Sequence, residues 1–223
     1  MDLSKNRVAL RVWGELACFT RPEMKVERVS YDVMTPSSAR GILEAVYWKP
    51  EIRWAVDRIR VLAPIRFTSV RRNELGGRGP SARTIQGYLD GGKTDVLAQV
   101  IEDDRQQRAA TVLRDVDYLI EAHYEVLEPS QPPQKYYEIF KRRAEKGQCF
   151  HRPYLGCREF TANFAWFEGE PLPGHPSLRG DRDLGWMLHD IEFGKENTPR
   201  FFHAKMRDGV VDIPPFSAAE VKA

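Results

Sequence analysis

The chain has 223 residues, the length of one ordinary domain or of one domain with a small companion. Hydrophobic residues make up 42% and charged residues 30%, a balance that excludes general disorder. The formal net charge of only +2 excludes a uniformly basic nucleic-acid-coating protein but leaves room for a local basic face. No apolar run reaches the ~18 residues of a membrane span, and charges interrupt the apolar N-terminus, so we expect neither a membrane segment nor a signal peptide.

The first half of the chain predicts a strand, a helix and two strands. Residues 7–17 alternate between apolar and polar side chains, the pattern of a half-buried strand. Thr35 and Pro36 mark a helix start, and apolar residues at helical spacing follow. The helix must end near Trp48, because Pro50 disfavours helical backbone at the residue before it. Residues 52–72 read as two strands with a break at Pro64.

The next segment, 73–93, contains six glycines and predicts a long mobile loop or hairpin tip. A short helix is possible within 95–110. Residues 115–127 alternate as a strand, 134–147 have helical spacing with Gly147 as the terminating residue, and 157–167 alternate again. From about residue 171 we expect short strands, including a hairpin at Asp208-Gly209.

This order predicts an α+β fold with an antiparallel sheet, namely a ferredoxin-like (RRM-like) βαββαβ domain. We expect that domain to span residues 1–170, with a Gly/Arg-rich loop inserted at 73–93. Residues 171–223 are expected to form a small C-terminal β region. The three cysteines are odd in number and lack CxxC spacing, so a reduced cytoplasm fits better than a disulfide scaffold or a zinc ribbon.

Local charge is the first functional signal. Between residues 53 and 83 there are eight arginines against two acidic residues, and the Gly-rich segment lies in the same stretch. Guanidinium groups on a flexible segment pair well with phosphate oxygens, which favours nucleic-acid binding. The alternative is a solvated hairpin whose charge is neutralised elsewhere in the fold. The candidate RNA-binding arginines are Arg71, Arg72, Arg78 and Arg83.

The helix 134–147 and the end of the first helix supply further candidates. Lys135 lies beside Tyr136 and Tyr137 at a helix N-terminus, where backbone N–H groups favour a phosphate, and Lys141 follows on the same helix. An ordinary reading, with Tyr136 in the core and Lys135 in solvent, has equal standing. Tyr47 lies at the edge of an apolar helical face, where most tyrosines are packing residues.

Histidine spacing and glycine motifs exclude several enzyme classes. The chain has no HExxH or HxxxH pair, no P-loop, no GxGxxG and no GxSxG, so zinc hydrolysis, nucleotide phosphoryl transfer and nicotinamide chemistry have no support. His123 lies on the polar face of its strand, where a ligand role is possible and a hydrogen-bonded surface histidine is the commoner situation.

Four stretches resemble a known family: 17–54 (ACFTRPEMKVERVSYDVMTPSSARGILEAVYWKPEIRW), 64–74 (PIRFTSVRRNE), 151–160 (HRPYLGCREF) and 183–188 (DLGWML). They are similar to the CRISPR-associated Cas-five family in its type I-C branch, a member of the RAMP superfamily with a ferredoxin-like domain. The resemblance covers nearly the whole chain.

The resemblance implies an endoribonuclease that cuts precursor CRISPR RNA at the base of the repeat hairpin without a metal or other cofactor. It then stays on the 5′ handle of the mature RNA and joins the surveillance (Cascade) complex with the backbone and large subunits. The family's catalytic set is a Tyr and an adjacent Lys-His pair. By local pattern these fall on Tyr47, Lys135 and Tyr136, so that a tyrosine stands where the family has histidine. His123 and His151 remain candidates for the missing imidazole.

That departure matters because a tyrosine with an ordinary pKa of ~10 is a poor base near pH 7. A second hypothesis is therefore a non-catalytic scaffold that binds the 5′ handle. A third is a general binder of double-stranded nucleic acid, including DNA, that uses Arg71, Arg72, Arg78 and Arg83.

Overall fold

The computed structural model describes residues 6–24, 26–77, 79–91, 100–128, 132–194 and 196–223. The chain divides into two compact units. The larger one consists of Met1–Thr68 together with Thr111–Ala223, and the smaller one is Ser69–Ala110. None of the described helices is both long enough and apolar enough to cross a membrane.

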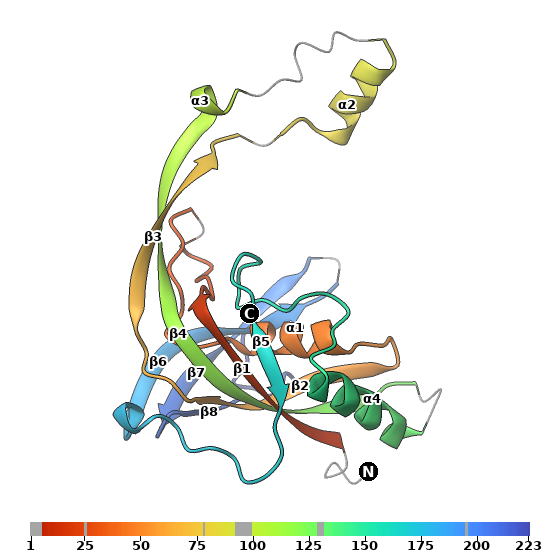
Figure 1. Ribbon diagram of the computed structural model, residues 1–223, viewed down its shortest axis with the longest axis vertical. Coiled ribbons are helices and arrows are strands. Elements are labelled where there is room, and N and C mark those ends of the chain that lie inside the picture. The colour runs from red at the N-terminus through yellow and green to blue at the C-terminus, as the bar shows by residue number, and fades with distance from the viewer. Residues whose placement is uncertain (1–5, 25, 78, 92–99, 129–131, 195) are drawn as a thin grey trace. The chain divides into compact units, whose positions relative to one another are not determined.

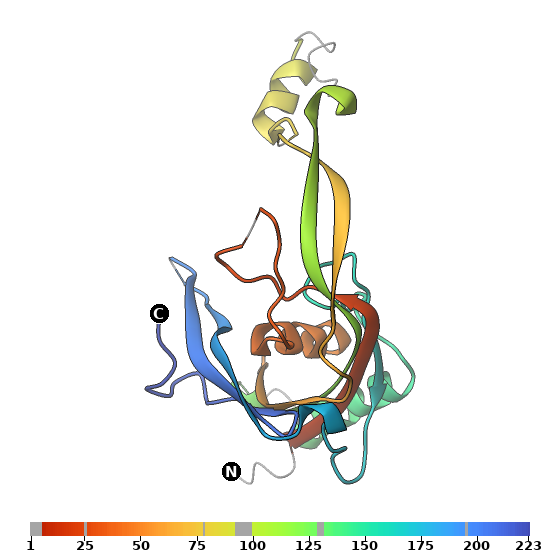
Figure 2. The same cartoon turned by 90° about the vertical axis from the view of Figure 1, so that its left-hand side faces the viewer.

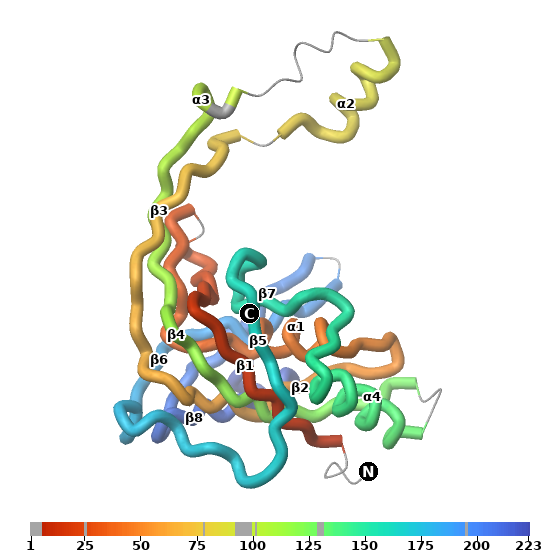
Figure 3. The backbone as a smooth tube through the Cα atoms, in the orientation of Figure 1, coloured from red at the N-terminus to blue at the C-terminus, as the bar shows by residue number. Residues whose placement is uncertain are grey.

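A ferredoxin-like core forms the larger unit, as the sequence predicts. Its strands are β1 (Arg7–Ala17), β2 (Ile52–Val61), β4 (Arg105–Val126) and β5 (Asn163–Trp166), and its helices are α1 (Pro36–Val46) and α4 (Pro133–Glu145). In the sheet these strands lie in the order β5-β1-β4-β2, and each neighbouring pair is antiparallel (Figure 1). β4 therefore pairs with β1 along one edge and with β2 along the other. Figure 3 shows the backbone of β4 beside that of β1.

The ends of α1 follow the sequence signals. The Thr35 hydroxyl accepts a hydrogen bond from the Ser38 N–H (3.4 Å), and Pro36 occupies the first turn. The helix ends at Val46, and Tyr47 has extended backbone with φ −156° and ψ 122°. α1 lies on the concave side of the sheet (Figure 2), where it packs on β2 and on a C-terminal strand. Its buried face includes Ile42, Leu43 and Val46.

α4 packs its aromatic residues against the sheet. Tyr136, Phe140 and Ala144 are buried on one face of the helix. The Trp54 ring of β2 lies 4.7 Å from the Phe140 ring and 5.5 Å from the Tyr124 ring of β4. Fully burying side chains of this size stabilises the fold by about 1.5–3 kcal/mol each, so this aromatic contact anchors α4 firmly.

The C-terminal strands extend the same sheet. They are β6 (Asp181–Glu192), β7 (Thr198–Arg207) and β8 (Val210–Asp212), preceded by a short 3₁₀ turn at Pro176–Leu178. β8 pairs with β2, and β7 pairs with both β8 and β6, all antiparallel. The predicted hairpin at Asp208-Gly209 is confirmed, and both residues have positive φ (50° and 78°) as a tight hairpin turn needs. The boundary expected near residue 171 falls between β5 and β6.

The smaller unit differs from the sequence expectation in its local structure. β3 (Phe67–Leu75) pairs with β4, and the range expected as a loop contains α2 (Ala82–Leu89), whose first turn is capped by the Ser81 hydroxyl. The helix considered within 95–110 is limited to α3 (Ile101–Asp104), because the polar residues after it join β4. Residues 78 and 92–99 lie outside the described residues.

Candidate active site

Tyr47 is fixed at the point where α1 ends and the chain turns toward β2. Its N–H donates to the Leu43 carbonyl (2.9 Å), the last helical hydrogen bond, and its own carbonyl accepts from the Trp54 indole N–H (2.8 Å). The side chain is only 3% exposed. Tyr47 is thus positioned by its backbone from both sides, with its ring packed into the junction of the two elements.

The first turn of α4 is held in place by a tyrosine of β4. The Tyr124 hydroxyl donates to the Pro133 carbonyl (2.8 Å). Tyr136 is buried, and its ring lies 6.2 Å from that of Tyr124. The adjacent Lys135 side chain is exposed. Of these two neighbouring candidate residues, Tyr136 is therefore packed in the core and Lys135 reaches solvent.

A single cation joins the two helices at this place. Arg143 of α4 donates to the Val46 carbonyl at the end of α1 (2.9 Å), and its guanidinium carbon lies 5.2 Å from the centre of the Tyr47 ring. The segment after α4 also contacts α1, since the Phe150 N–H donates to the Ala45 carbonyl (2.8 Å). Tyr47 therefore meets the last turn of α4 through Arg143, and Tyr136 of the same helix also lies near it, so that Tyr47, Tyr136 and Arg143 form one packed cluster.

Burial keeps the phenols of this cluster protonated. The pKa of Tyr47 is raised, first by burial and then by the nearby Tyr136 and Glu51, while Arg143 opposes the shift. Burial also raises the pKa of Tyr124 to about 12. Near pH 7 these hydroxyls are neutral, so they can donate hydrogen bonds and orient a ligand oxygen, but they are not general bases.

The histidines are placed differently from one another. His123 follows the strand alternation and lies on the face of β4 opposite Tyr124, with its Nδ1 2.8 Å from an Asp57 carboxylate oxygen of β2. That hydrogen bond raises the pKa of His123. The exposed His151 directly follows Phe150, which is bonded to α1. Of the two candidate imidazoles, His151 is therefore the one whose chain segment contacts the Tyr47 end of α1.

The arginine-rich stretch separates into two groups. Arg53, Arg58, Arg60 and Arg66 are paired with acidic residues; their partners are Glu125 (2.5 Å), Asp212 (2.6 Å), Glu121 and Asp115 (3.0 Å), respectively. The positive charge of these four arginines is therefore neutralised within the fold, which is the alternative explanation of the arginine-rich stretch.

The other arginines lie on the smaller unit. Arg71 of β3 and Arg83 of α2 are exposed, and Arg72 is partly exposed with an interaction of its own. Arg78 lies outside the described residues.

Lys141 of α4, in the larger unit, is paired with an acidic residue. The two carboxylate oxygens of Glu168 are 2.9 and 3.1 Å from the Lys141 Nζ, which also lies 5.4 Å from the centre of the Trp166 ring.

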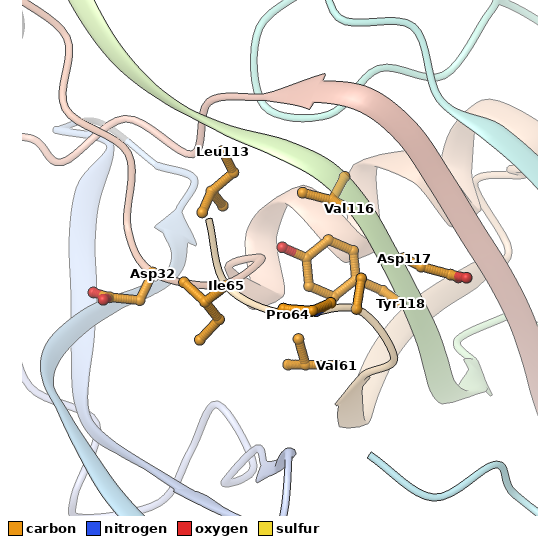
Figure 4. A pocket seen from close by; sticks show the side chains of 9 residues that line it. Asp32, Val61, Pro64, Ile65, Leu113, Val116, Asp117 and Tyr118 are labelled. Carbon is orange, nitrogen blue, oxygen red and sulfur yellow. The ribbon is translucent and has the colours of Figure 1, made fainter. Parts of the chain in front are cut away.

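A small hollow in the larger unit has none of these residues in its lining (Figure 4). It is mainly apolar around Tyr118, and its two carboxylates belong to ion pairs, Asp32 with Arg21 and Asp117 with Arg11. No group of three His, Cys, Asp or Glu side chains in the described part of the chain is placed to hold a metal ion.

Sequence reasoning missed the two residues that position the cluster. Tyr124 was indistinguishable from other apolar positions of its strand. Arg143 did carry a signal, because it shares the helical spacing of Tyr136 and Phe140, and a cation on an apolar helix face indicates a specific partner.

Comparison with known proteins identifies a family that matches this chain. The sequence profile of the family Cas_Cas5d, described as "CRISPR-associated protein (Cas_Cas5)", matches residues 8–214. A protein of Mannheimia succiniciproducens named "CRISPR pre-crRNA endoribonuclease Cas5d" is 56% identical, over 97% of this chain and 99% of its own. A protein of Thermus thermophilus with the same name is 44% identical, over 93% of this chain and 91% of its own.

A solved structure agrees in fold. The structure titled "Crystal Structure of CRISPR-associated Protein" has a TM-score of 0.69 at 23% identity and covers 97% of this chain and 96% of its own. Both sequence and fold thus match over nearly the full length. The chain belongs to the CRISPR-associated Cas5 family, in its Cas5d branch.

Proposed function

We propose that this protein is a metal-independent endoribonuclease that cuts precursor CRISPR RNA at the repeat hairpin. The observation that carries the proposal is full-length similarity, at 56% and 44% identity, to two proteins named as pre-crRNA endoribonucleases. The packed cluster of Tyr47, Tyr136 and Arg143, with Lys135 exposed beside it, supports it with residue types suited to RNA strand cleavage.

The reaction needs little chemistry from the protein. The ribose 2′-oxygen forms a bond to the adjacent phosphorus, the bond from phosphorus to the 5′-oxygen breaks, and the proton lost by the 2′-hydroxyl is balanced by one gained at the leaving oxygen. The products are a 2′,3′-cyclic phosphate and a 5′-hydroxyl. Holding the two oxygens in line lowers the barrier by positioning alone.

The candidate residues divide these tasks. Lys135 is the exposed cation that stabilises charge on the phosphorane. The neutral phenol of Tyr47 orients the 2′-hydroxyl or donates to the leaving oxygen, and Tyr136 takes the place of the family's histidine in the same cluster. Since its raised pKa keeps Tyr47 from acting as a base near pH 7, we expect a slow, single-turnover enzyme that keeps its product.

After cleavage we propose that the protein stays on the 5′ handle and becomes a cytoplasmic subunit of the type I-C surveillance complex. Family membership supports this role. The exposed Arg71 and Arg83, with Arg72, are the proposed contacts to RNA phosphates and to double-stranded DNA.

The second candidate is a scaffold that binds the handle without cutting it. It is favoured by two observations: Tyr47 and Tyr136 are only 3% and 1% exposed, and the residue after Lys135 is a tyrosine in place of the family's histidine. In this role the cluster stabilises the helix junction, and Lys135 contributes only charge.

The deciding experiment incubates a 5′-labelled repeat hairpin from the same locus with the protein in EDTA. The variants are Tyr47→Phe and Lys135→Ala, and Lys205→Ala, at an exposed lysine of β7, is the charge-matched control. We expect one cut with a cyclic-phosphate end, lost in both site variants and kept in the control. Tight binding without a cut would establish the scaffold. Cleavage by both site variants at the full rate would show that the reaction uses other residues.

A further inference from the structure

Two of the three cysteines lie side by side where β1 ends. The Cys18 N–H donates to the Leu155 carbonyl (3.0 Å), which fixes the end of β1 against the 154–161 segment. Gly156 lets the two backbones touch: its φ is +82°, and a Cβ there would lie 2.0 Å from the Cys18 carbonyl oxygen. This close approach places Cys157 beside Cys18, although the residues are 139 positions apart.

The sulfur atoms share one hydroxyl neighbour. Thr20 Oγ1 lies 3.5 Å from Cys18 Sγ and 3.9 Å from Cys157 Sγ, and Cys157 Sγ lies 3.6 Å from the Cys18 carbonyl oxygen. Each thiol lies close enough to shift the pKa of the other. Both sulfurs therefore border the same hydroxyl oxygen, and a disulfide between them would require an S–S distance of about 2.05 Å.

The two sulfurs have unequal reactivity. The pKa of Cys157 is lowered to about 6, first by its interaction with the Cys18 thiol and then by the Thr20 hydroxyl and the Arg28 guanidinium; burial and Glu159 oppose the shift. Arg28 and Glu159 are themselves 3.7 Å apart. The pKa of Cys18 is raised by its interaction with Cys157 and by burial. Cys157 is also the more accessible sulfur, since Cys18 is 1% exposed.

We propose that Cys18 and Cys157 form a thiol-pair modification site that a peroxide oxidises to a disulfide. The Cys157 thiolate attacks one peroxide oxygen, the O–O bond breaks, and the departing hydroxide takes a proton to become water. The resulting sulfenic acid is attacked by the Cys18 sulfur, which forms the S–S bond, while its proton leaves with the hydroxyl as a second water. Two thiols lose two hydrogens, and one peroxide is reduced to two waters.

This site is independent of the proposed ribonuclease. None of Cys18, Thr20, Arg28 and Cys157 belongs to the Tyr47 cluster, so the two proposals succeed or fail separately. Oxidation would cross-link the end of β1 to the segment before β5, both of which belong to the larger unit.

The third cysteine makes a matched internal control, because Cys149 is free and similarly accessible. The experiment alkylates the reduced protein with iodoacetamide from about pH 5 to about pH 8 and follows each cysteine by peptide mass. We expect Cys157 to react about tenfold faster than Cys149 at pH 7, because it is mostly thiolate there.

A second measurement treats the protein with hydrogen peroxide and maps the cross-linked peptides. We expect the intact mass to fall by two hydrogens, a Cys18–Cys157 peptide that dithiothreitol reverses, and the same result in Cys149→Ser. The Cys18→Ala variant should stop at oxidised Cys157 acids. If that variant does not fold, the peptide map of the unaltered chain still shows whether Cys18 and Cys157 are cross-linked. Two alkylatable thiols after peroxide, or a cross-link through Cys149, would overturn the proposal.

Discussion

Arg143 holds the ring of Tyr47 and the backbone of the residue before it with one side chain. Its guanidinium donates to the Val46 carbonyl (2.9 Å) and lies 5.2 Å from the Tyr47 ring centre. The carbonyl is one of those left without a helical partner where α1 ends, so the contact caps the helix and fixes the orientation of the tyrosine together. Arg143 is therefore a positioning residue for Tyr47.

Replacing Arg143 with methionine should lower the free energy of unfolding by about 1–2 kcal/mol, because a charged hydrogen bond and a cation–π contact are lost. Misplacement of Tyr47 should reduce the cleavage rate about tenfold. Chemical denaturation and single-turnover cleavage measure the two effects. The control is Arg142→Met, a neighbouring exposed arginine. Equal cleavage rates for the two variants, with RNA affinity unchanged in both, would contradict the positioning role.

Removing the Tyr124 hydroxyl should loosen the start of α4. Tyr124→Phe keeps the ring and its packing on Trp54 but loses the hydrogen bond to Pro133, which should lower the free energy of unfolding by about 1–2 kcal/mol. Urea denaturation checks the size of the loss. Hydrogen exchange should show faster opening of the first α4 turn than of its last turn; uniform exchange along the helix would show that Tyr124 does not anchor this end.

The His123–Asp57 pair predicts a pH-dependent contribution to stability. The hydrogen bond to Asp57 raises the pKa of His123 above its ordinary value of 6.5. The stabilisation is therefore complete below pH 6.5 and is lost as the pH rises through the higher pKa of the folded state. Asp57→Asn should destabilise the protein more at about pH 6 than at about pH 8.5.

The measurement for this pair is denaturation at both pH values, with NMR titration of the His123 ring. His151→Gln, at an exposed histidine, is the control and should show no such difference. A destabilisation by Asp57→Asn that is the same at both pH values would mean that His123 is neutral in the pair.

The two groups of arginines predict different salt dependences of RNA binding. Arg71→Ala and Arg83→Ala should each reduce the slope of log affinity against log salt by about 0.7–0.9, as the loss of one phosphate contact does. Arg53→Ala should leave the slope unchanged, because Arg53 is paired with Glu125. Fluorescence anisotropy over a salt series gives the slopes. An equal change for all three variants would assign the binding to overall charge.

The sequence was informative where structure depends on neighbouring residues. Alternation along 7–17 and 115–127, the Thr35-Pro36 start and the Asp208-Gly209 turn all follow from local geometry, and each is confirmed. The βαββαβ order of these elements then left few possible sheet topologies, so the fold class could be predicted from the order alone.

The sequence was less informative where the structure or role of a residue depends on a partner far away along the chain. The segment 105–110 is polar and reads as possible helix, yet it is strand because β3 pairs with β4. Arg58 and Arg60 contributed to the local excess of arginines, yet their carboxylate partners lie 61–154 positions away along the chain. Tyr124 and Arg143 acquire their roles only when α4 packs beside α1 and β4.

The chain leaves the larger unit and returns to it at adjoining points. The Arg114 N–H donates to the Arg66 carbonyl (2.9 Å), and the Leu62 N–H donates to the Asp117 carbonyl (2.8 Å). A short turn joining residues 68 and 111 would therefore leave the β5-β1-β4-β2 pairing of the core intact. A truncated protein without the segment between them is therefore a practical way to separate RNA cleavage from the phosphate contacts proposed for Arg71, Arg72 and Arg83.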